Sequence, residues 1–410
     1  MGEVPLRRNR DFVLLQVGQA LSTVGSEASG IAYALLVLAL TNSPAKAGLV
    51  GFARLVPWVL FALPAGVVVD RVNRKWLMIV SDVVRVVALA TLGVAAASGH
   101  LPFVLIPVVA FVEGAMYVVF NIAEIGAVRS VVPASQLPRA FAAEQARLSS
   151  VYLAGPPLGG FLFGLGRSLP FLVDAISYAF STGTLLAMRT PFQEERDEAA
   201  RGSLRAQVRE GLSWLWSHTF LRTCALLFAA GNLSFAAFDL TLIVAGRRQG
   251  LSSPAIGGLI AIVGGLSLVG SLAAPRLHRL LSMRTAIVGS AWLALGIGVF
   301  LIWPNVFVLV AGAAPLLFVN PPVNAMIIGY RVAIVPDRLQ GRVNSVARSL
   351  ALVGLPLGPV VAGVLLASFS ARTTVAFLLA WFVLLAVVTT SSRAIRAAPS
   401  FEEAAGAVPS

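Results

Sequence analysis

The sequence predicts an all-α membrane protein with twelve transmembrane helices arranged in two pseudo-symmetric six-helix bundles. Three observations predict this fold class. The chain of 410 residues is 58% hydrophobic and 12% charged, whereas a soluble domain is about 45–50% apolar and about 25% charged. Its apolar residues form twelve long runs, and part of the first half recurs in the second. A water-facing surface cannot be covered with this composition.

The apolar runs define the individual spans. A transmembrane helix needs about 20 largely apolar residues. The runs that meet this length are 12–41, 47–69, 76–98, 101–128, 139–166, 170–189, 219–246, 254–275, 284–302, 305–330, 341–366 and 371–392. An even number of spans places both termini on one side of the membrane.

The basic residues orient the chain. Most arginines and lysines lie in loops on the same side as the termini, and the opposite side holds Lys46, Arg167, Arg247, Arg248 and Arg372. Short cytoplasmic loops are enriched in positive charge. We therefore expect a multi-pass protein of the cell inner (cytoplasmic) membrane with both termini in the cytoplasm.

A polar connection divides the chain into two sets of six spans. We expect an N-terminal bundle at 1–189, a cytoplasmic linker at 190–218, a C-terminal bundle at 219–398 and a cytoplasmic tail at 399–410. Within the linker, LRAQVREGLSWLW spaces its apolar residues as a helix does and ends near Trp214 and Trp216. This pattern predicts a helix that lies at the membrane interface.

Composition and motifs exclude several function classes. The net charge of +13 is spread between apolar runs and not gathered in one patch, so no nucleic acid is expected as a partner. Three histidines and the single Cys224 provide no metal ligand set and no disulfide framework. The chain has no G-x-x-x-x-G-K phosphate loop, so ATP is not the expected energy source. No nucleophile, base and acid stand together, so we expect neither an enzyme nor a cofactor.

An internal repeat relates the two halves. The stretch VVPASQLPRAFAAEQARLSSVYLAGPPLGGFL aligns with IVPDRLQGRVNSVARSLALVGLPLGPVVAGVLL, and the matched residues are mostly unusual ones. The matches are Pro133 with Pro336, Arg139 with Arg342, Gly155 with Gly358, Pro156 with Pro359 and Gly160 with Gly363. Two six-helix halves of parallel topology are typical of secondary transporters.

The loop after the second span carries a specific motif. GVVVDRVNRK supplies Gly66, Asp70, Arg71, Arg74 and Lys75, and so resembles the G-x-x-x-D-R-x-G-R-K pattern of the major facilitator superfamily. Asn73 replaces a glycine there, and asparagine tolerates a left-handed backbone better than most residues. The resemblance implies the major facilitator fold. It also implies that Asp70 holds one conformational state by engaging the inner end of span eleven, near Gly341 and Arg342.

The fifth span carries a second motif of the same family. Gly155, Pro156, Gly159 and Gly160 fill its G-P-x-x-G-G signature, which the resemblance associates with exporters that exchange substrate for protons. A second interpretation is a close helix contact, because small residues let backbones approach. Both interpretations predict that span five packs tightly on span eight. Further stretches, such as EGLSWLWSHTFLR, are similar to the branch of enterobactin and macrolide exporters.

One feature departs from the family pattern. Many proton-coupled exporters place an arginine four residues before a glycine of span four. If Gly114 is that glycine, the position holds Ala110, and Glu113 stands beside Gly114 instead.

Several charged residues lie inside predicted spans, where ionisable groups are costly and indicate function. Glu27 and Glu113 are the predicted proton carriers, and the alternative is an ion pair with Arg54. Asp239 and Arg348 are further candidates. Two pairs spaced three residues apart should share a helix face and form structural ion pairs, namely Asp82 with Arg85 and Glu144 with Arg147. Asp174 begins a span and is expected only to cap it.

Aromatic and amide side chains near mid-span provide a candidate cavity for an amphipathic compound. They are Tyr117, Phe120, Asn121, Asn232, Phe235 and Asn324. Ordinary core packing is the alternative for any single aromatic residue.

These features predict a secondary active transporter that exports small organic molecules, such as drugs, antibiotics or siderophore-like compounds, by proton antiport with alternating access. Its expected partners are the small-molecule substrate, protons and the lipid bilayer, and we expect a monomer. An importer or lipid transporter on the same fold is the alternative, as is a membrane sensor that transports nothing.

Overall fold

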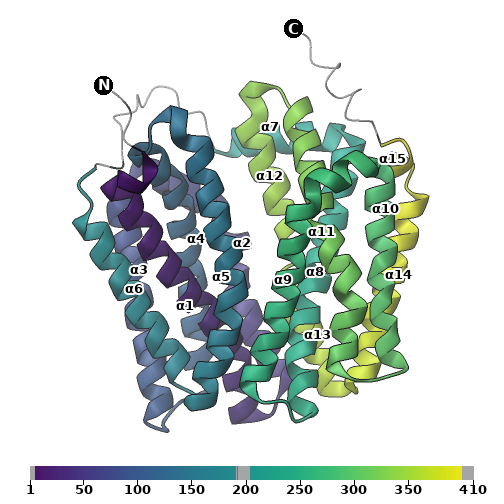
Figure 1. The fold of residues 1–410 in the computed structure, drawn as a ribbon, viewed down its shortest axis with the longest axis horizontal. Coiled ribbons are helices and arrows are strands. Elements are labelled where there is room, and N and C mark those ends of the chain that lie inside the picture. Colours follow the sequence, from purple (N-terminus) through teal and green to yellow (C-terminus); the bar gives the residue numbers. More distant parts are fainter. Residues whose placement is uncertain (1–4, 191, 193–203, 399–410) are drawn as a thin grey trace. The chain divides into compact units, whose positions relative to one another are not determined.

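A computed structural model describes residues 5–190, 192 and 204–398 (Figure 1). Within these ranges, twelve helical segments are long and apolar enough to cross a membrane, which confirms the predicted number of spans. The helices cluster into two units, which are described separately. Unit 1 comprises residues 1–200 and 250–261, and unit 2 comprises residues 201–249 and 262–410.

Unit 1 contains the first six spans, whose helices are labelled in Figure 1. A short 3-10 helix, η1 (Leu6–Arg8), precedes them, and η2 (Ala134–Gln136) lies before the fifth. The spans are α1 (Arg10–Thr41), α2 (Pro44–Arg71), α3 (Arg74–Ala97), α4 (Leu105–Val131), α5 (Leu137–Leu165) and α6 (Leu169–Ala187). Within the bundle α1 packs on α5 and α6, α3 packs on α4 and α6, and α2 packs on α4. The beginning of α9 (Ser253–Leu280) also belongs to this unit.

Unit 2 begins with α7 (Leu204–Ser217), the helix predicted within the linker. The remaining helices of the unit, together with the rest of α9, are α8 (Thr219–Arg248), α10 (Met283–Leu293), η4 (Ala294–Leu301), α11 (Val306–Ile334), η5 (Asp337–Leu339), α12 (Gln340–Leu352), α13 (Leu357–Ser368), α14 (Ala371–Ser391) and α15 (Arg393–Arg396). Here α8 packs on α12, α13 and α14, while α11 packs on α10 and η4.

The same neighbours recur in both units. The contact of α1 with α5 corresponds to that of α8 with α12 and α13, and the contact of α1 with α6 corresponds to that of α8 with α14. Likewise α3 with α4 corresponds to α10 and η4 with α11. The internal repeat seen in the sequence is therefore a repeat of helix packing.

Side chains that cap the helices fix several of their first turns. Asn9 accepts a hydrogen bond from the backbone N–H of Phe12 at 3.1 Å, and Ser43 accepts one from Lys46 at 3.3 Å. Such caps satisfy backbone donors that have no partner in the helix. Asn73 caps α3 in the same way and has φ −57°, so it does not adopt the left-handed backbone expected for the motif glycine.

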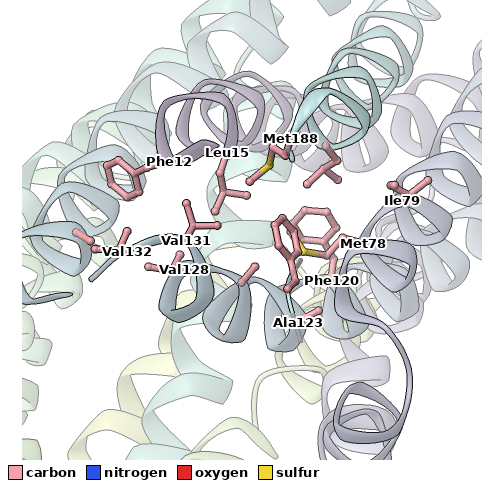
Figure 2. Close-up of a cluster of buried hydrophobic side chains, with 14 of the residues drawn as sticks. Phe12, Leu15, Met78, Ile79, Phe120, Ala123, Val128, Val131, Val132 and Met188 are labelled. Atoms are coloured by element: carbon pink, nitrogen blue, oxygen red, sulfur yellow. The ribbon is translucent and has the colours of Figure 1, made fainter. Parts of the chain in front are cut away.

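A cluster of buried hydrophobic side chains joins several helices of unit 1 (Figure 2). Phe12 and Leu15 of α1 lie against Val128 and Val131 of α4, with Met78 of α3 alongside. Phe12 and Leu15 are 6% and 1% exposed, so apolar packing holds α1 against α4 here.

Two predicted spans are not continuous α-helices. The ninth consists of α10 followed by η4, and the eleventh is interrupted between Leu352 and Leu357. Gly296 and Gly298 lie in η4, and Pro356 stands in the interruption of the eleventh span. Glycine and proline disfavour an α-helix, so both breaks have a local cause. By contrast, α5 runs through Pro156 and Pro157 as one helix.

Candidate functional site

An ion pair between α2 and α4 lies inside unit 1. Arg54 donates from Nε to Glu113 Oε2 at 3.0 Å and from Nη2 to Glu113 Oε1 at 3.2 Å. Arg54 Nη2 also donates to the backbone oxygen of Ser26 in α1 at 3.0 Å. Glu113 is 1% exposed, and a two-point arginine–carboxylate contact is the strongest geometry for such a pair. Three helices are thus joined by one guanidinium group.

Glu27 differs from Glu113 in its surroundings. Its side chain is half-buried on α1, and within the described part of the chain it makes no hydrogen bond or ion pair. An ion pair with Arg54 was the alternative that the sequence offered for both carboxylates, and Arg54 forms it with Glu113 and not with Glu27. Glu27 faces Gly155 of α5, because a Cβ atom added to that glycine would collide with the Glu27 side chain.

The pair of Asp82 and Arg85 on α3 forms as predicted. Arg85 Nη2 lies 3.1 Å from Asp82 Oδ1, and both side chains are buried. Ser181 of α6 donates to Asp82 Oδ2 at 2.6 Å. The Arg85 guanidinium lies 4.3 Å from the ring centroid of Tyr178 and 4.8 Å from that of Phe120. This geometry supports a structural role, since the charge is balanced by a carboxylate and two aromatic faces.

The second predicted pair, Glu144 with Arg147, is wrong. Arg147 Nη2 instead donates to Glu124 Oε1 of α4 at 2.9 Å, and Nη1 donates to Thr23 of α1 at 3.2 Å. Glu124 is 5% exposed and was not singled out from the sequence. Its spacing of eleven residues from Glu113 places the two carboxylates on one face of α4, and this spacing is the signal that could have identified it.

Asp174 is also more than a helix cap. It lies beyond the first turn of α6, is fully buried, and accepts a hydrogen bond from Ser29 of α1 at 2.6 Å. The expectation of a capping role is therefore wrong. A Cβ atom on Gly25 would lie 2.5 Å from Asp174 Oδ1, so the glycine makes room for the carboxylate between the two helices.

The remaining predicted residues of unit 1 line a small polar pocket. Tyr117, Phe120 and Asn121 border a space of about 20 Å³ together with Glu124 and Arg147. A space of about this volume holds a single water molecule. Tyr117 packs on Trp58 of α2 with ring centroids 5.8 Å apart. A space of this size is too small for an amphipathic compound, so these residues line no substrate cavity within the described part of unit 1.

The last two residues of the signature motif, at the start of α3, bind the chain that follows α6. Lys75 Nζ donates to the backbone oxygen of Met188 at 2.7 Å, and Arg74 Nη1 donates to that of Phe192 at 3.3 Å. Arg71 is exposed, and Gly66 has open space where a Cβ atom would lie. The side chain of Asp70 lies outside the part that the structure describes, so its engagement of span eleven stays a prediction.

The glycines of α5 make close helix contacts. A Cβ atom on Gly159 would collide with the backbone oxygen of Ala28 in α1, and one on Gly160 would collide with that of Ser253 at the start of α9. The reverse contact is equally close, because a Cβ atom on Gly257 of α9 would collide with the oxygen of Pro156. Span five therefore packs closely on the beginning of span eight, as predicted, and equally closely on span one, which was not predicted.

Unit 2 contains a cavity of about 790 Å³. Most of its wall is apolar, and it includes the predicted residues Asn232, Phe235 and Asn324 and the buried Cys224. Its wall comes mainly from helices α8, α10, α11, α12 and α14, with Leu215 of α7 and Ala294 of η4 added. Ligand pockets for organic molecules commonly measure about 300–1,000 Å³. The cavity is therefore large enough for a drug-sized compound.

Three predicted charged residues of unit 2 occupy different places. Arg348 borders the cavity, whereas Asp239 is exposed on α8 outside its wall. Arg342 forms an ion pair with Glu210 of α7, and Arg338 lies 3.4 Å from the same carboxylate. Helix α7 is held further by packing of Trp214 on Val335, Leu339 and Val343. Among the described residues, no group of histidine, cysteine, aspartate or glutamate could hold a metal ion.

The twelve-span fold and the large cavity define a membrane transport protein. Residues 15–291 match the Major Facilitator Superfamily, and the chain belongs to that family. It is thus a transporter and not an enzyme.

Named relatives point to an efflux branch of the family. The chain is 26% identical over 362 residues to the multidrug efflux pump Tap of Mycobacterium tuberculosis, covering 85% of each chain. It is 23% identical over 206 residues to macrolide efflux protein A of Streptococcus pyogenes, covering 50% of this chain and 51% of that protein. Both relationships are distant, so substrates do not transfer directly.

Solved structures agree on the fold. The nucleoside transporter NupG superposes with a TM-score of 0.70 at 14% identity, covering 95% of this chain and 100% of that one. A bacterial homologue of the iron transporter ferroportin gives a TM-score of 0.70 at 15% identity, covering 95% and 99%. At these identities the likeness extends to the fold alone.

Proposed function

We propose that this transporter exports small amphipathic organic molecules in exchange for protons. The cavity in unit 2 carries the first half of the proposal, because its volume and mostly apolar wall suit a drug-sized compound. The names of the efflux relatives support the direction of transport. The proposed setting is a monomer in the cell inner membrane with both termini in the cytoplasm, where the halves 1–189 and 219–398 rock about a linker at 190–218.

Glu27 carries the second half of the proposal. A carboxyl group in an apolar span is costly, and four carboxyl groups buried inside spans of unit 1 are bonded to an arginine or a serine, namely Asp82, Glu113, Glu124 and Asp174. Glu27 has no such bond, and it stands where α1 meets the glycine face of α5. It can therefore take up and release a proton without breaking an ion pair, while movement of α5 changes its surroundings.

Transport in proteoliposomes with an imposed pH gradient tests this proposal. The probes are three fluorescent dansyl compounds that share one body and differ in charge: dansylglycine, dansylamide and dansylcadaverine. We expect at least one of them to accumulate against its gradient when the pH gradient is present, and to equilibrate without it. Accumulation in the direction of proton flow would instead favour an importer, and no movement of any probe would contradict small-molecule export of this class.

Glu27→Gln should abolish accumulation driven by the pH gradient while leaving probe binding intact. Glutamine keeps the size and hydrogen-bonding groups of glutamate but carries no titratable proton. Asp239→Asn is the matched control, since it neutralises an exposed carboxylate of α8 outside the cavity wall. If Glu27→Gln transports at the parent rate, Glu27 is not the proton carrier, and Glu113→Gln becomes the variant to measure.

A further inference from the structure

The charges that border the unit 2 cavity are all positive. Arg331 and Arg348 line it, and its described wall contains no aspartate or glutamate. We propose that this cavity binds the anionic group of an amphipathic ligand, with a carboxylate as the preferred group and Arg331 as its principal contact. The inference rests on the proposed function, because it names the substrate class that the exporter would carry.

Arg331 is positioned as a carboxylate receptor. It lies in the last turn of α11, half-buried, and its Nε donates to Asn344 Oδ1 of α12 at 2.7 Å. Asn344 is itself held, since its Nδ2 donates to Gln340 Oε1 at 3.1 Å. The guanidinium is thus oriented through one nitrogen by a neutral partner, and its charge is not neutralised by any carboxylate among the described residues.

The two terminal nitrogens of Arg331 remain available. Neither nitrogen makes a hydrogen bond within the described chain. Neither belongs to the buried polar atoms that lack a hydrogen-bond partner, so both remain accessible. A guanidinium presents paired N–H groups that match the two oxygens of a carboxylate. Held at Nε and open at both Nη atoms, Arg331 can make that two-point contact with a ligand in the cavity.

Two asparagine side chains lie on the same face of α11 as Arg331. Asn320 and Asn324 are one turn apart, and Asn324 lies two turns before Arg331, so the three side chains share one face of the helix. All three border the cavity, and neither amide makes a hydrogen bond within the described chain. They provide donors and acceptors for the polar part of a ligand without adding a negative charge that would repel an anion.

Aromatic residues of the same cavity provide a surface for the apolar body of the ligand. Phe228 and Phe235 of α8 and Phe382 of α14 border the same cavity. Aromatic rings supply large apolar contacts at a small cost in side-chain entropy. A cavity with one positively charged edge and an aromatic wall matches a molecule with an aromatic body and one acidic group.

General positive charge at the ends of the helices is a competing explanation for anion binding. Arginine residues collect at the cytoplasmic ends of transmembrane helices whatever a protein binds. Arg338 provides the comparison, because it follows α11 closely, is exposed, pairs with Glu210 and does not border the cavity. If general positive charge attracts anions, Arg331 and Arg338 should matter equally.

Equilibrium binding of the three dansyl probes to the full-length protein in nanodiscs tests the proposal. We expect dansylglycine to bind at least about tenfold more tightly than dansylcadaverine, since a charge-assisted hydrogen bond contributes roughly that factor. Arg331→Gln should remove this preference, Arg331→Lys should keep part of it, and Arg338→Gln should leave it unchanged. Equal affinities for the three probes, or equal losses in Arg331→Gln and Arg338→Gln, would overturn the proposal.

A second variant tests the proposal without changing an arginine, in case the arginine variants misfold. Asn324→Asp adds a negative charge to the cavity at a side chain that makes no hydrogen bond within the described chain, so folding should be retained. It should weaken dansylglycine binding and strengthen dansylcadaverine binding, and an unchanged ratio would contradict an anion site here. Because binding is measured without a gradient, intact anion preference with no transport would contradict only the exporter proposal.

Discussion

The two units share their helix packing but differ in what fills them. Every buried acidic or basic side chain in the described chain belongs to unit 1, namely Asp11, Asp82, Arg85, Glu113, Glu124 and Asp174. Unit 2 buries only uncharged polar groups such as Ser234 and Thr241, and it holds the large cavity instead. The same helix packing therefore encloses buried charges in unit 1 and a mostly apolar cavity in unit 2.

The backbone contacts show what the repeat preserves. A Cβ atom on Gly155 would collide with the Glu27 side chain of α1, and one on the corresponding Gly358 would collide with the backbone oxygen of Leu233 in α8. Close approach of spans five and eleven to the first membrane span of each unit, α1 or α8, is therefore maintained. The interior side chains are free to differ, since helix contacts of this kind depend on small residues and not on charge.

Substitutions at two glycines, one in each unit, should distinguish the tight helix contact from the cavity. The loss of transport expected at Gly159 is the largest effect. Gly159→Leu should abolish transport, because its side chain would collide with the backbone of Ala28, which cannot move aside cheaply. Gly231→Leu should fold normally, since Gly231 borders the cavity and has open space at its Cβ position, but it should weaken ligand binding. Monodispersity and dansylglycine binding distinguish the two. Normal transport by Gly159→Leu would mean that this face of α5 is not a tight contact.

Removal of a buried charge should have the next largest effect. Arg85→Leu leaves Asp82 buried without its partner, and breaking such a pair costs about 3–5 kcal/mol of stability. Asn324→Leu, a change from polar to apolar in unit 2, should alter stability by no more than about 0.5 kcal/mol. Thermal unfolding in detergent measures both. Equal losses would show that the interiors of the two units do not differ in the way described.

The smallest effect is expected at the ion pairs of α7. Glu210 bonds to Arg342 and lies near Arg338, but its side chain is 38% exposed. Solvent screens exposed pairs, which typically contribute about 0–1 kcal/mol. Glu210→Gln should therefore change the unfolding temperature little, because Trp214 still packs on α12 and η5. A large loss of stability would mean that the charge, and not the packing, holds α7.

Much of the fold could be predicted from sequence, because membrane spans are read from long apolar runs. The twelve spans and the linker helix required only composition and spacing. The interruptions in the ninth and eleventh spans were missed, although Gly296, Gly298 and Pro356 stand there. Apolar runs report length and not backbone geometry. Proline itself is ambiguous, since α5 continues through Pro156 and Pro157 while the eleventh span does not continue through Pro356.

The site was predicted less completely, and the ion pairs show why. Asp82 with Arg85 followed from spacing because both residues lie on one helix. Glu144 and Arg147 have the same spacing, but Arg147 pairs with Glu124 of a neighbouring helix. Spacing identifies residues on one face and cannot tell which helix that face meets. The cavity in unit 2 likewise depends on how several helices pack together, so the sequence indicated some of its residues but not its volume.

The hydrogen bonds around the chain that follows α6 bear on where this protein can be cut. Met188 and Phe192 are bound through their carbonyl oxygens by Lys75 and Arg74, and Asp11 accepts hydrogen bonds from the backbone N–H groups of Arg189 and Thr190. A fragment ending at Ala187, the last residue of α6, would lose these hydrogen bonds. For co-expression of the protein as two separate polypeptides, the first should therefore extend through Phe192.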